Sequence, residues 1–448
     1  MNTVALWALL GCRPSVEALV NEAIPTVVTL RWESTLAGNA SVLYGQSRPE
    51  LSTPMSESSG QQHEVVVYGL KAGQDVALQG VVRDELGNEE RTEVVELSLD
   101  PPPADLPRFT LTHDSAGLLP GYVLLSLLEP GQGWLVILDQ DADPVWFWKV
   151  QAALTAMSPS VSLDGSSILF DHYDIQNRTD ISGMTRVALD GTDAIQTRLF
   201  QGHHDYAELP EGEIAWISVD LREVQHEGET VLVAGDSVLV GAEGGSEATG
   251  SERFSFWNRS APYEPCEHFD GDAHGTGGKD WTHANSLMYL PEDDSLVVLS
   301  KNLDALVAFD AFNGEVRWQI GGRDETMQFT QAGRAWSHGH MSQIWDDGFV
   351  IFDNGYHNGA ISRASEYRFD ISAGTYERVW DYAHPDEAFI PLLGDVKKLP
   401  DDSYLVSWTS IGTLSRLDAT GEILWQAEAE LGAATGRALF IEDLYTLR

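Results

Sequence analysis

The stretch Leu306-Val-Ala-Phe-Asp310-Ala-Phe-Asn-Gly314-Glu-Val-Arg-Trp318 consists of two short apolar segments joined by a turn of Asp, Asn and Gly. Apolar runs of this length on either side of turn residues predict two antiparallel β-strands in a hairpin. The same unit, again ending in Trp, returns at residues 134–146, 367–380 and 414–425. The chain therefore repeats one hairpin at wide intervals.

A second unit lies ahead of this hairpin and also predicts two strands. Its clearest copy is Tyr289-Leu-Pro-Glu-Asp-Asp-Ser-Leu-Val-Val298. Further copies lie at residues 162–170, 208–217, 344–352 and 398–406, with a weaker one at 118–125. One copy of each unit supplies four strands, which is one blade of a propeller. Repeats of about 57 residues over positions 105–448 predict an all-β fold with a six-bladed β-propeller.

Residues 24–100 predict a separate small β-sandwich ahead of the propeller. Short alternating strands follow one another there with turn residues between them. Trp32, Tyr44 and the segment Tyr68-Gly-Leu70-Lys-Ala-Gly73 resemble a fibronectin type III domain. Asp100-Pro-Pro-Pro103 is a stiff linker to the propeller. We expect this domain to be a spacer or docking module without chemistry of its own.

The charge of the chain excludes one large class of partners. Its 69 acidic and 27 basic residues give a net charge of -42, a field that repels nucleic-acid backbones. An apolar content of 43% is ample for a core, so the charge belongs to a solvated surface. Only Cys12 and Cys266 are present, so we expect neither a disulfide framework nor a cysteine-based metal site.

Residues 1–23 resemble an export segment with a linker. The chain begins MNTVALWALLGC, and the ending Leu9-Leu10-Gly11-Cys12 resembles a bacterial lipoprotein processing site in which Cys12 is acylated. This predicts an exported protein, periplasmic or on the cell surface, with a lipid tether to the membrane. Against it, the apolar run is short and no Lys or Arg precedes it. A plain terminus is the alternative.

Three histidines are expected to meet on the propeller axis. Each blade places its innermost strand on the central channel, and His204, His283 and His340 lie at comparable distances ahead of their turns. His113 has a similar offset and is a possible fourth. Single histidines at strand starts usually bond to a neighbouring blade. Three histidines at equivalent positions of three blades favour a functional site at one mouth of the channel.

A zinc site is the first alternative for three converging imidazoles. No carboxylate stands in the same register of those blades, and the chain has no HExxH spacing. We therefore predict a site without a metal. Lys301 follows the strand at residues 296–300, in the same blade as His283, and a lone cation beside histidines in so acidic a chain favours an anion-binding pocket. A surface lysine in an ion pair is the alternative.

One interval of the repeat is too long. About 80 residues separate His204 from His283, and the surplus of about 20 to 25 falls between residues 224 and 279. This insertion is rich in Gly, Glu and Asp. Long loops on a rigid scaffold often cover or bind a ligand, whereas an inert solvated insertion is the alternative.

Several motifs resemble the bacterial arylsulfate sulfotransferases. The resemblance covers about residues 105–448 and is most specific over 280–382. It rests on Asp280-Trp-Thr-His283-Ala-Asn285-Ser286, on Gly339-His340-Met341, on Val350-Ile-Phe352-Asp353-Asn354-Gly355, and on the stretches at 309–322, 362–367, 379–382 and 436–445. It implies a six-bladed propeller that moves a sulfuryl group from one phenol ester to another phenol, without a nucleotide sulfate donor and without a cofactor.

The resemblance also implies roles for individual residues. His340 matches the histidine that is transiently sulfated, and His283 matches one that stabilises the sulfuryl oxygens. His204 matches a third, although His203 stays open for that role. Lys301 stands where the family usually has arginine, so a point charge replaces a two-pronged donor. We expect His340 to attack as a neutral imidazole, with His283, His204 and Lys301 stabilising oxyanions and moving the phenol proton.

The residue before the nucleophile also departs from the family, which commonly has Gln where this chain has Gly339, preceded by His338. Aromatic side chains near the channel could stack on an aryl substrate: Trp281, Trp336, Trp345 and Tyr356. The candidate substrate-binding residues are His203, His338, Asn285, Asn354 and Arg363.

Two other functions stay open at this point. The first is a non-catalytic extracellular propeller that binds an anionic or aromatic ligand, which the lysine and the N-terminal domain favour. The second is a quinone-dependent dehydrogenase, suggested by the Gly-x-x-x-Trp turns alone.

Overall fold

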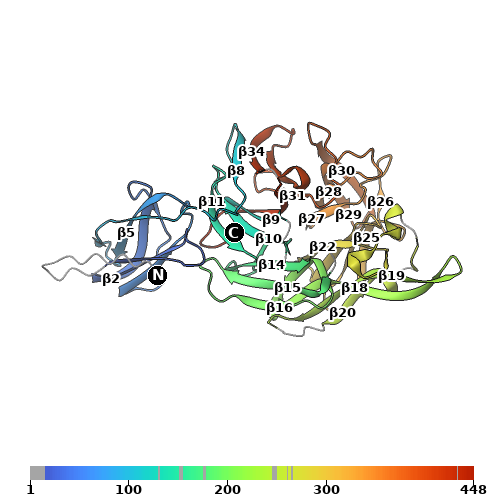
Figure 1. The fold of residues 1–448 in the computed structure, drawn as a ribbon, viewed down its shortest axis with the longest axis horizontal. Helices are drawn as coiled ribbons and strands as arrows, with labels where there is room; N and C mark the ends of the chain where they lie inside the picture. The colour runs from blue at the N-terminus through green and yellow to red at the C-terminus, as the bar shows by residue number, and fades with distance from the viewer. Residues whose placement is uncertain are drawn as a thin grey trace.

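The computed structural model describes residues 16–129, 132–150, 155–174, 178–244, 250–259, 261–263, 266–430 and 432–447. Over these residues the regular structure is β-strand with single 3-10 turns, arranged as an N-terminal β region beside a six-bladed β-propeller (Figure 1). No helix among them is long and apolar enough to cross a bilayer. Cys12 and the rest of the predicted export segment up to residue 15 lie outside the described residues.

The N-terminal region is organised around one long strand. β2 (Val28–Gly45) pairs with β1 and β4 through its first half and with β3 and β5 through its second. Its remaining members are β1 (Glu17–Val20), β3 (Leu51–Ser52), β4 (Gly60–Val67), β5 (Asp75–Arg83), β6 (Glu89–Arg91) and β7 (Val95–Ser98). Trp32, Val42 and Leu78 belong to its own buried core. Its assignment to the fibronectin type III class stays a prediction.

This region packs against the start of the propeller. Ile24 and Val27 share a buried cluster with Trp146 of the propeller. Lys71 reaches Asp139, Asp141 and Asp143 at 2.8, 2.5 and 2.8 Å. Burial of the apolar contacts keeps the two regions together.

Six antiparallel sheets radiate from the axis, so that inner strands such as β22, β27 and β31 lie toward the middle and outer ones such as β16, β20 and β34 toward the rim (Figure 1). From the inside outward, blade one contains β35 (Ala434–Ile441), β9 (Tyr122–Glu129), β10 (Gln132–Leu138) and β11 (Pro144–Lys149). Blade two contains β12 (Thr155–Ala156) with β13 (Ser160–Val161), then β14 (Ser167–Asp174), β15 (Arg178–Ala188) and β16 (Ile195–Arg198). Blade three contains β17 (Gly202–Leu209), β18 (Glu213–His226), β19 (Glu229–Ala242) and β20 (Ser251–Ser255), with β21 (Lys279–Asp280) parallel to β19.

The other three blades repeat the pattern. Blade four contains β22 (Ala284–Leu290), β23 (Ser295–Ser300), β24 (Ala305–Asp310) and β25 (Val316–Gly321). Blade five contains β27 (His340–Trp345), β28 (Gly348–Asp353), β29 (Arg363–Asp370), β30 (Thr375–Ala383) and β26 (Gln328–Phe329). Blade six contains β31 (Asp395–Lys398), β32 (Tyr404–Trp408), β33 (Thr413–Leu417), β34 (Ile423–Ala429) and β8 (Phe109–Asp114).

Both ends of the propeller segment help to close the ring. β35, from the C-terminal part of the chain, is the innermost strand of blade one, where it pairs with β9. β8, which precedes every other propeller strand, forms the outer edge of blade six on β34. Two strands from opposite ends therefore hold the first and last blades in place.

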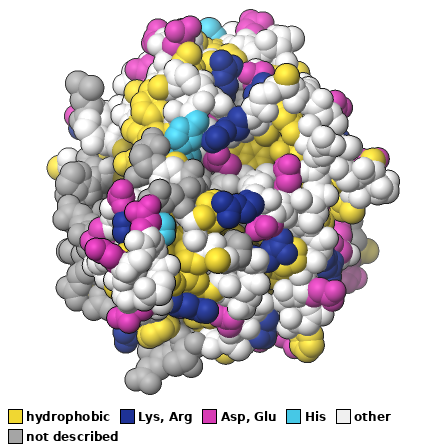
Figure 2. Space-filling view, turned by 90° about the vertical axis from the view of Figure 1, so that its right-hand side faces the viewer, with side chains coloured by type: hydrophobic (Ala, Val, Ile, Leu, Met, Phe, Trp, Pro, Cys, Tyr) yellow, Lys and Arg dark blue, Asp and Glu magenta, His cyan; other side chains and the backbone are white. Residues whose placement is uncertain are grey.

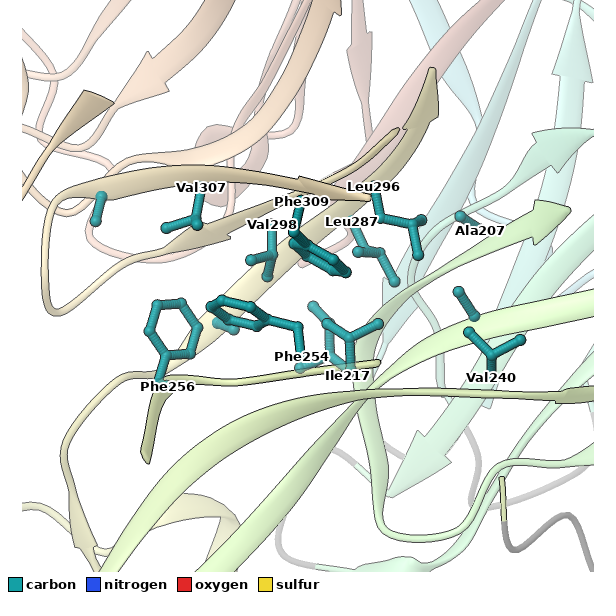
Figure 3. Packing of buried hydrophobic residues seen from close by; sticks show 14 of the residues in the cluster. Ala207, Ile217, Val240, Phe254, Phe256, Leu287, Leu296, Val298, Val307 and Phe309 are labelled. Carbon is teal, nitrogen blue, oxygen red and sulfur yellow. The ribbon is translucent and has the colours of Figure 1, made fainter. Parts of the chain in front are cut away.

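Apolar side chains fill the space between neighbouring blades, as Figure 3 shows for blades three and four. Phe254 and Phe309 stack there with ring centroids 4.7 Å apart. Trp281 and Trp336 are 0% and 1% exposed within two such clusters. These two tryptophans are packing residues, so the suggestion that they stack on a substrate is wrong.

The surface carries charges of both signs. On the face opposite the N-terminal region, acidic and basic side chains are interspersed with small apolar areas (Figure 2). A charge excess distributed in this way is solvated, which explains how a chain of net charge -42 still builds a dense core.

Candidate active site

Inner strands of neighbouring blades bring the predicted histidines together at one end of the ring. His204 lies in β17 and His283 directly before β22, and their ring centroids are 5.0 Å apart. His340 is the first residue of β27. Its ring lies near both, since a proton on His340 would lower the pKa of His204 and of His283 further, beyond the larger effect of burial. Asn285 joins the two blades, since its Nδ2 donates to the Gly339 carbonyl at 3.0 Å.

The backbone holds several of these histidines in a rare conformation. His204, His283 and His338 have φ of 61°, 46° and 58°. This left-handed region is sparsely populated by residues other than glycine, and it clusters at functional sites. Each histidine lies where the chain turns into an inner strand.

The long insertion adds a histidine that the sequence analysis did not find. His274 lies in the 3-10 turn η4 (Ala273–Gly275). Its ring stacks on His203 at 4.2 Å and lies 5.2 Å from His204 and 5.1 Å from His283. The insertion therefore covers the histidines, and it is not an inert excursion into solvent.

Carboxylates lie directly behind these imidazoles. Asp236 of β19 accepts from His203 Nε2 at 3.1 Å, and its other oxygen accepts from Thr282 Oγ1 at 2.7 Å. Asp280 accepts from His283 Nδ1 at 2.6 Å. The lack of a carboxylate in the histidines' own register therefore does not leave the site without carboxylates, because these come from β19 and from three residues ahead of His283.

Hydrogen bonding fixes the tautomer of His340. Asn354 donates both protons of its Nδ2, to the carbonyls of Ile390 at 2.7 Å and Leu393 at 3.0 Å. Its Oδ1 must therefore accept from His340 Nδ1, 2.6 Å away. The Nε2 of His340 is left with its lone pair, which is the atom that a nucleophile needs.

The same reasoning applies to His283 and His204. His283 donates from Nδ1 to Asp280. His203 donates from Nε2 to Asp236, so its Nδ1 accepts from His204 Nδ1 at 2.9 Å. Both His204 and His283 then carry a lone pair on Nε2. The Nε2 atoms of His283 and His204 can therefore accept a proton. A carboxylate stabilises each ring, Asp280 by direct contact with His283 and Asp236 through His203.

Burial keeps these imidazoles neutral. Burial, followed by the charge of Lys301, lowers the pKa of His340 to about 3. Burial lowers the pKa of His274 to about 4 and that of His204 and His283 well below the usual value. At neutral pH these rings are therefore uncharged.

Lys301 supplies a cation among neutral rings. Its backbone N–H donates to the His283 carbonyl at 3.1 Å, and the residue is only 3% exposed. Burial lowers its pKa, while Asp280, Cys266 and Asp304 raise it. The alternative of a surface lysine is wrong. A buried ammonium that lowers the pKa of His274, His283 and His340 produces the positive potential that an anion requires.

The remaining candidates divide into two groups. His203 and Asn285 belong to the histidine cluster, and the Oδ1 of Asn285 is buried without a hydrogen-bond partner in the described part of the chain. Arg363 pairs instead with Asp381 at 2.6 Å, and no described interaction joins it to the histidines. His113 is exposed on β8 at the outer edge of blade six, so it is not a fourth imidazole of the site.

His338 faces a neighbouring cluster. Its Nε2 contacts the Sγ of Cys266 at 3.3 Å. Its ring lies 4.8 Å from that of Tyr356, and a role of either residue in binding the substrate stays a prediction. Trp345 lies against the charged ends of Arg368 and Lys398.

Comparison with known proteins gives one family. The family model described as "Arylsulfotransferase (ASST)" matches residues 122–433, which include every histidine of the cluster. No curated protein matches the chain.

Solved structures resemble the chain only in part. A structure of a nidogen/laminin complex is 9% identical and covers 70% of this chain and 97% of its own, with a TM-score of 0.44. A protein of unknown function from Bacteroides caccae is 11% identical, covers 71% and 99%, and has a TM-score of 0.39. A streptogramin B lyase is 12% identical, covers 71% and 86%, and has a TM-score of 0.37. We draw no functional conclusion from likenesses this distant.

Proposed function

Because the chain belongs to the arylsulfotransferase family, we propose that it transfers a sulfuryl group from a phenolic sulfate ester to a second phenol, with His340 as the covalent carrier. The observation that carries the proposal is the fixed tautomer of His340, whose lone pair lies beside a buried cation and two further imidazoles.

In the first half-reaction the Nε2 lone pair of His340 attacks sulfur. An N–S bond forms, the S–O bond to the aryl group breaks, and the phenolate leaves with the electron pair. Sulfuryl transfer is expected to resemble phosphoryl transfer, with charge on the three equatorial oxygens, which the ammonium of Lys301 stabilises. Asn354 accepts from Nδ1 throughout and so supports the positive charge on the sulfated ring.

In the second half-reaction the acceptor phenol gives up its proton. The neutral Nε2 of His283 takes it, and Asp280 behind the ring stabilises the resulting imidazolium. The phenol oxygen attacks sulfur, the N–S bond breaks, and His340 returns to its neutral form. His283 then releases the proton to solvent, where it balances the phenolate of the first step. The pair of His204 and His203 with Asp236 offers a second place for the proton.

Substrate entry requires the insertion to move. His340 and Lys301 are 2% and 3% exposed, and His274 covers the rings beside them. Opening of this segment exposes the carrier, and its return excludes water, which would otherwise hydrolyse the sulfated histidine.

Parallel lines in initial-rate plots are the test of this proposal. The assay follows p-nitrophenolate release from p-nitrophenyl sulfate at several phenol concentrations, with the sulfated product quantified. Ping-pong kinetics support a carrier on the enzyme. Intersecting lines, or no transfer above the rate without enzyme for any phenol tried, would refute it.

Replacement of Lys301 by methionine is expected to lower kcat/KM for p-nitrophenyl sulfate by about a hundredfold, because a buried charge that stabilises the transition state is lost. Lys301→Arg keeps the charge and is expected to stay within about tenfold of the parent. Lys149→Met, at a half-exposed lysine paired with Asp105, serves as the matched control. If Lys301→Met and Lys149→Met were equally active, Lys301 would have no role in catalysis.

Replacement of Asn354 by leucine is expected to lower kcat about tenfold to a hundredfold and leave KM nearly unchanged. Asn354 acts through His340 as a positioning residue, and its loss frees the ring to adopt the wrong tautomer. Nitrogen-15 NMR of the histidines reports that tautomer directly. Asn258→Leu, at an exposed asparagine, is the control. A purely structural role for Asn354 predicts a lower Tm with an unchanged tautomer.

A non-catalytic, ligand-binding propeller is the second candidate, favoured by the same deep burial of His340 and Lys301. It predicts that p-nitrophenyl sulfate raises the Tm without being turned over. The dehydrogenase alternative gains no support, since the matching family is one of transferases.

Export and a lipid tether at Cys12 are a separate proposal, supported by the lipoprotein-like ending at Leu9-Leu10-Gly11-Cys12. Expression of the full chain in a bacterium tests it. A membrane-bound product whose N-terminus is an acylated Cys12 supports it, and an unprocessed Met1 in the soluble fraction contradicts it.

A further inference from the structure

A second cluster of donor atoms lies next to the proposed active site. Cys266 comes from the insertion, whereas His338 and His357 come from blade five on either side of β28. One donor atom from each lies within 4.8 Å of the other two. We propose that these three side chains bind a transition-metal ion of the Zn²⁺ class, which fastens the insertion to blade five.

The spacing of the donor atoms fits such an ion. Zn–S and Zn–N bonds of about 2.3 and 2.0–2.1 Å in a tetrahedron place sulfur and nitrogen about 3.6 Å apart. The Sγ of Cys266 and the Nε2 of His338 are 3.3 Å apart. The separation of this pair of donors is therefore close to the one that a shared ion requires.

The environment of His338 is a second, independent observation. The residue is 1% exposed, its Nε2 points at the sulfur, and its backbone is in the left-handed region. Its Nδ1 is buried without a hydrogen-bond partner in the parts of the chain that the structure describes. A strained and buried backbone thus holds the Nε2 of His338 toward the sulfur, as a preformed metal ligand requires, and coordination at Nε2 leaves the ring proton on Nδ1.

The chemistry of the donors selects the ion. Thiolate and imidazole together favour Zn²⁺ and its neighbours over Mg²⁺ or Ca²⁺, which prefer oxygen ligands. The acidic cluster of Asp139, Asp141 and Asp143 is no competitor, since it offers only oxygen donors and the ammonium of Lys71 already contacts all three carboxylates. Three protein ligands leave one position for water or another exchangeable ligand.

The location gives the ion a structural effect. Cys266 and His338 are 72 residues apart in sequence, and Cys266 precedes His274, which covers the catalytic histidines. An ion between insertion and blade closes a long loop and anchors the insertion at Cys266, so that substrate entry requires movement only of the residues beyond this anchor. The number of cysteines in the sequence gave no sign of this site, because one cysteine and two distant histidines form it.

Metal titration of the purified full chain tests the proposal. We expect about one Zn²⁺ per chain by mass spectrometry of the metal, a raised Tm, and slower hydrogen exchange at residues 266–275 when Zn²⁺ is bound. Co²⁺ in place of Zn²⁺ is expected to give a thiolate-to-cobalt charge-transfer band in the near ultraviolet. That band requires the sulfur as a ligand.

Two single substitutions locate the ion. Cys266→Ser and His357→Gln are expected to weaken Zn²⁺ binding about a hundredfold or more, and Cys266→Ser removes the cobalt band. His113→Gln, at an exposed histidine far from the cluster, is expected to bind like the parent. Circular dichroism and Tm without metal show whether each variant is folded, so weakened binding by a folded variant supports the proposal. Absence of stoichiometric binding in the parent, or full binding by folded Cys266→Ser, overturns it, and the latter places the ion among His203, His204 and His274 instead.

Discussion

Replacement of His340 by glutamine is expected to lower sulfuryl transfer by about a thousandfold or more while the protein stays folded. Glutamine can still donate a hydrogen bond to Asn354, but it offers no nucleophilic nitrogen. The parent protein, incubated with p-nitrophenyl sulfate and no acceptor, is expected to gain the mass of one SO₃ group on the peptide that contains His340. The variant is expected to gain none.

His113→Gln is the matched control for this experiment, because it makes the same chemical change at an exposed position on blade six. A sulfated peptide in the His340→Gln variant would mean that another residue is the carrier. A parent that turns over without any sulfated peptide would point to direct transfer between the two substrates.

A second large effect is expected from acid. Burial lowers the pKa of His172 and His274 to about 4 and that of His204 and His283 well below the ordinary value of 6.5. In the unfolded chain these rings bind protons near pH 6.5, whereas in the folded chain they stay neutral. The unfolded state therefore gains protons first as pH falls, and the free energy of unfolding decreases below about pH 6.5.

Two buried carboxyls act in the opposite direction. Burial raises the pKa of Asp171 and Asp304 to about 7, so the folded state binds these protons first and gains stability as pH falls. Burial also lowers the pKa of His340 to about 3 and that of His338 to about 2, so six histidines oppose these two carboxyls. Each group contributes up to about 1.4 kcal/mol per pH unit, so the free energy of unfolding is expected to fall by several kcal/mol per pH unit near pH 5. Denaturant unfolding at pH 7, 6 and 5 measures this slope. A free energy of unfolding that stays level from pH 7 to 5 would contradict this prediction. His274→Gln removes one of the titrating groups, so the free energy of unfolding of that variant is expected to fall by about 1.4 kcal/mol less per pH unit.

The fold was accessible from sequence because each blade is encoded locally. Strand, turn and strand are recognisable in units such as residues 289–298 and 306–318, and six similar units leave a ring as the arrangement that buries every sheet face. Closure by β8 was not visible, because that strand completes a blade more than 300 residues away. Nothing local in the sequence of residues 109–114 identifies its partner.

The candidate site was predictable only where the repeat itself positions a residue. His204 and His283 lie at the starts of inner strands, so the symmetry of the ring predicts their approach. His274 comes from a 3-10 turn of the insertion, which follows no repeat rule, and Asp236 comes from the third strand of blade three, where the repeat gives no reason to expect a residue of the site. The burial of Lys301 likewise depends on what the insertion covers, and no local pattern encodes that.

Closure by β35 also has a consequence for biosynthesis. The inner edge of β9 has no partner until residues 434–441 have left the ribosome, so a nascent chain exposes an apolar strand edge for nearly the whole of translation. An exposed edge of this kind can pair with a strand of another chain, so incompletely synthesised chains are prone to aggregate. Chaperone demand and losses in expression are therefore expected to depend on how quickly the last strand docks.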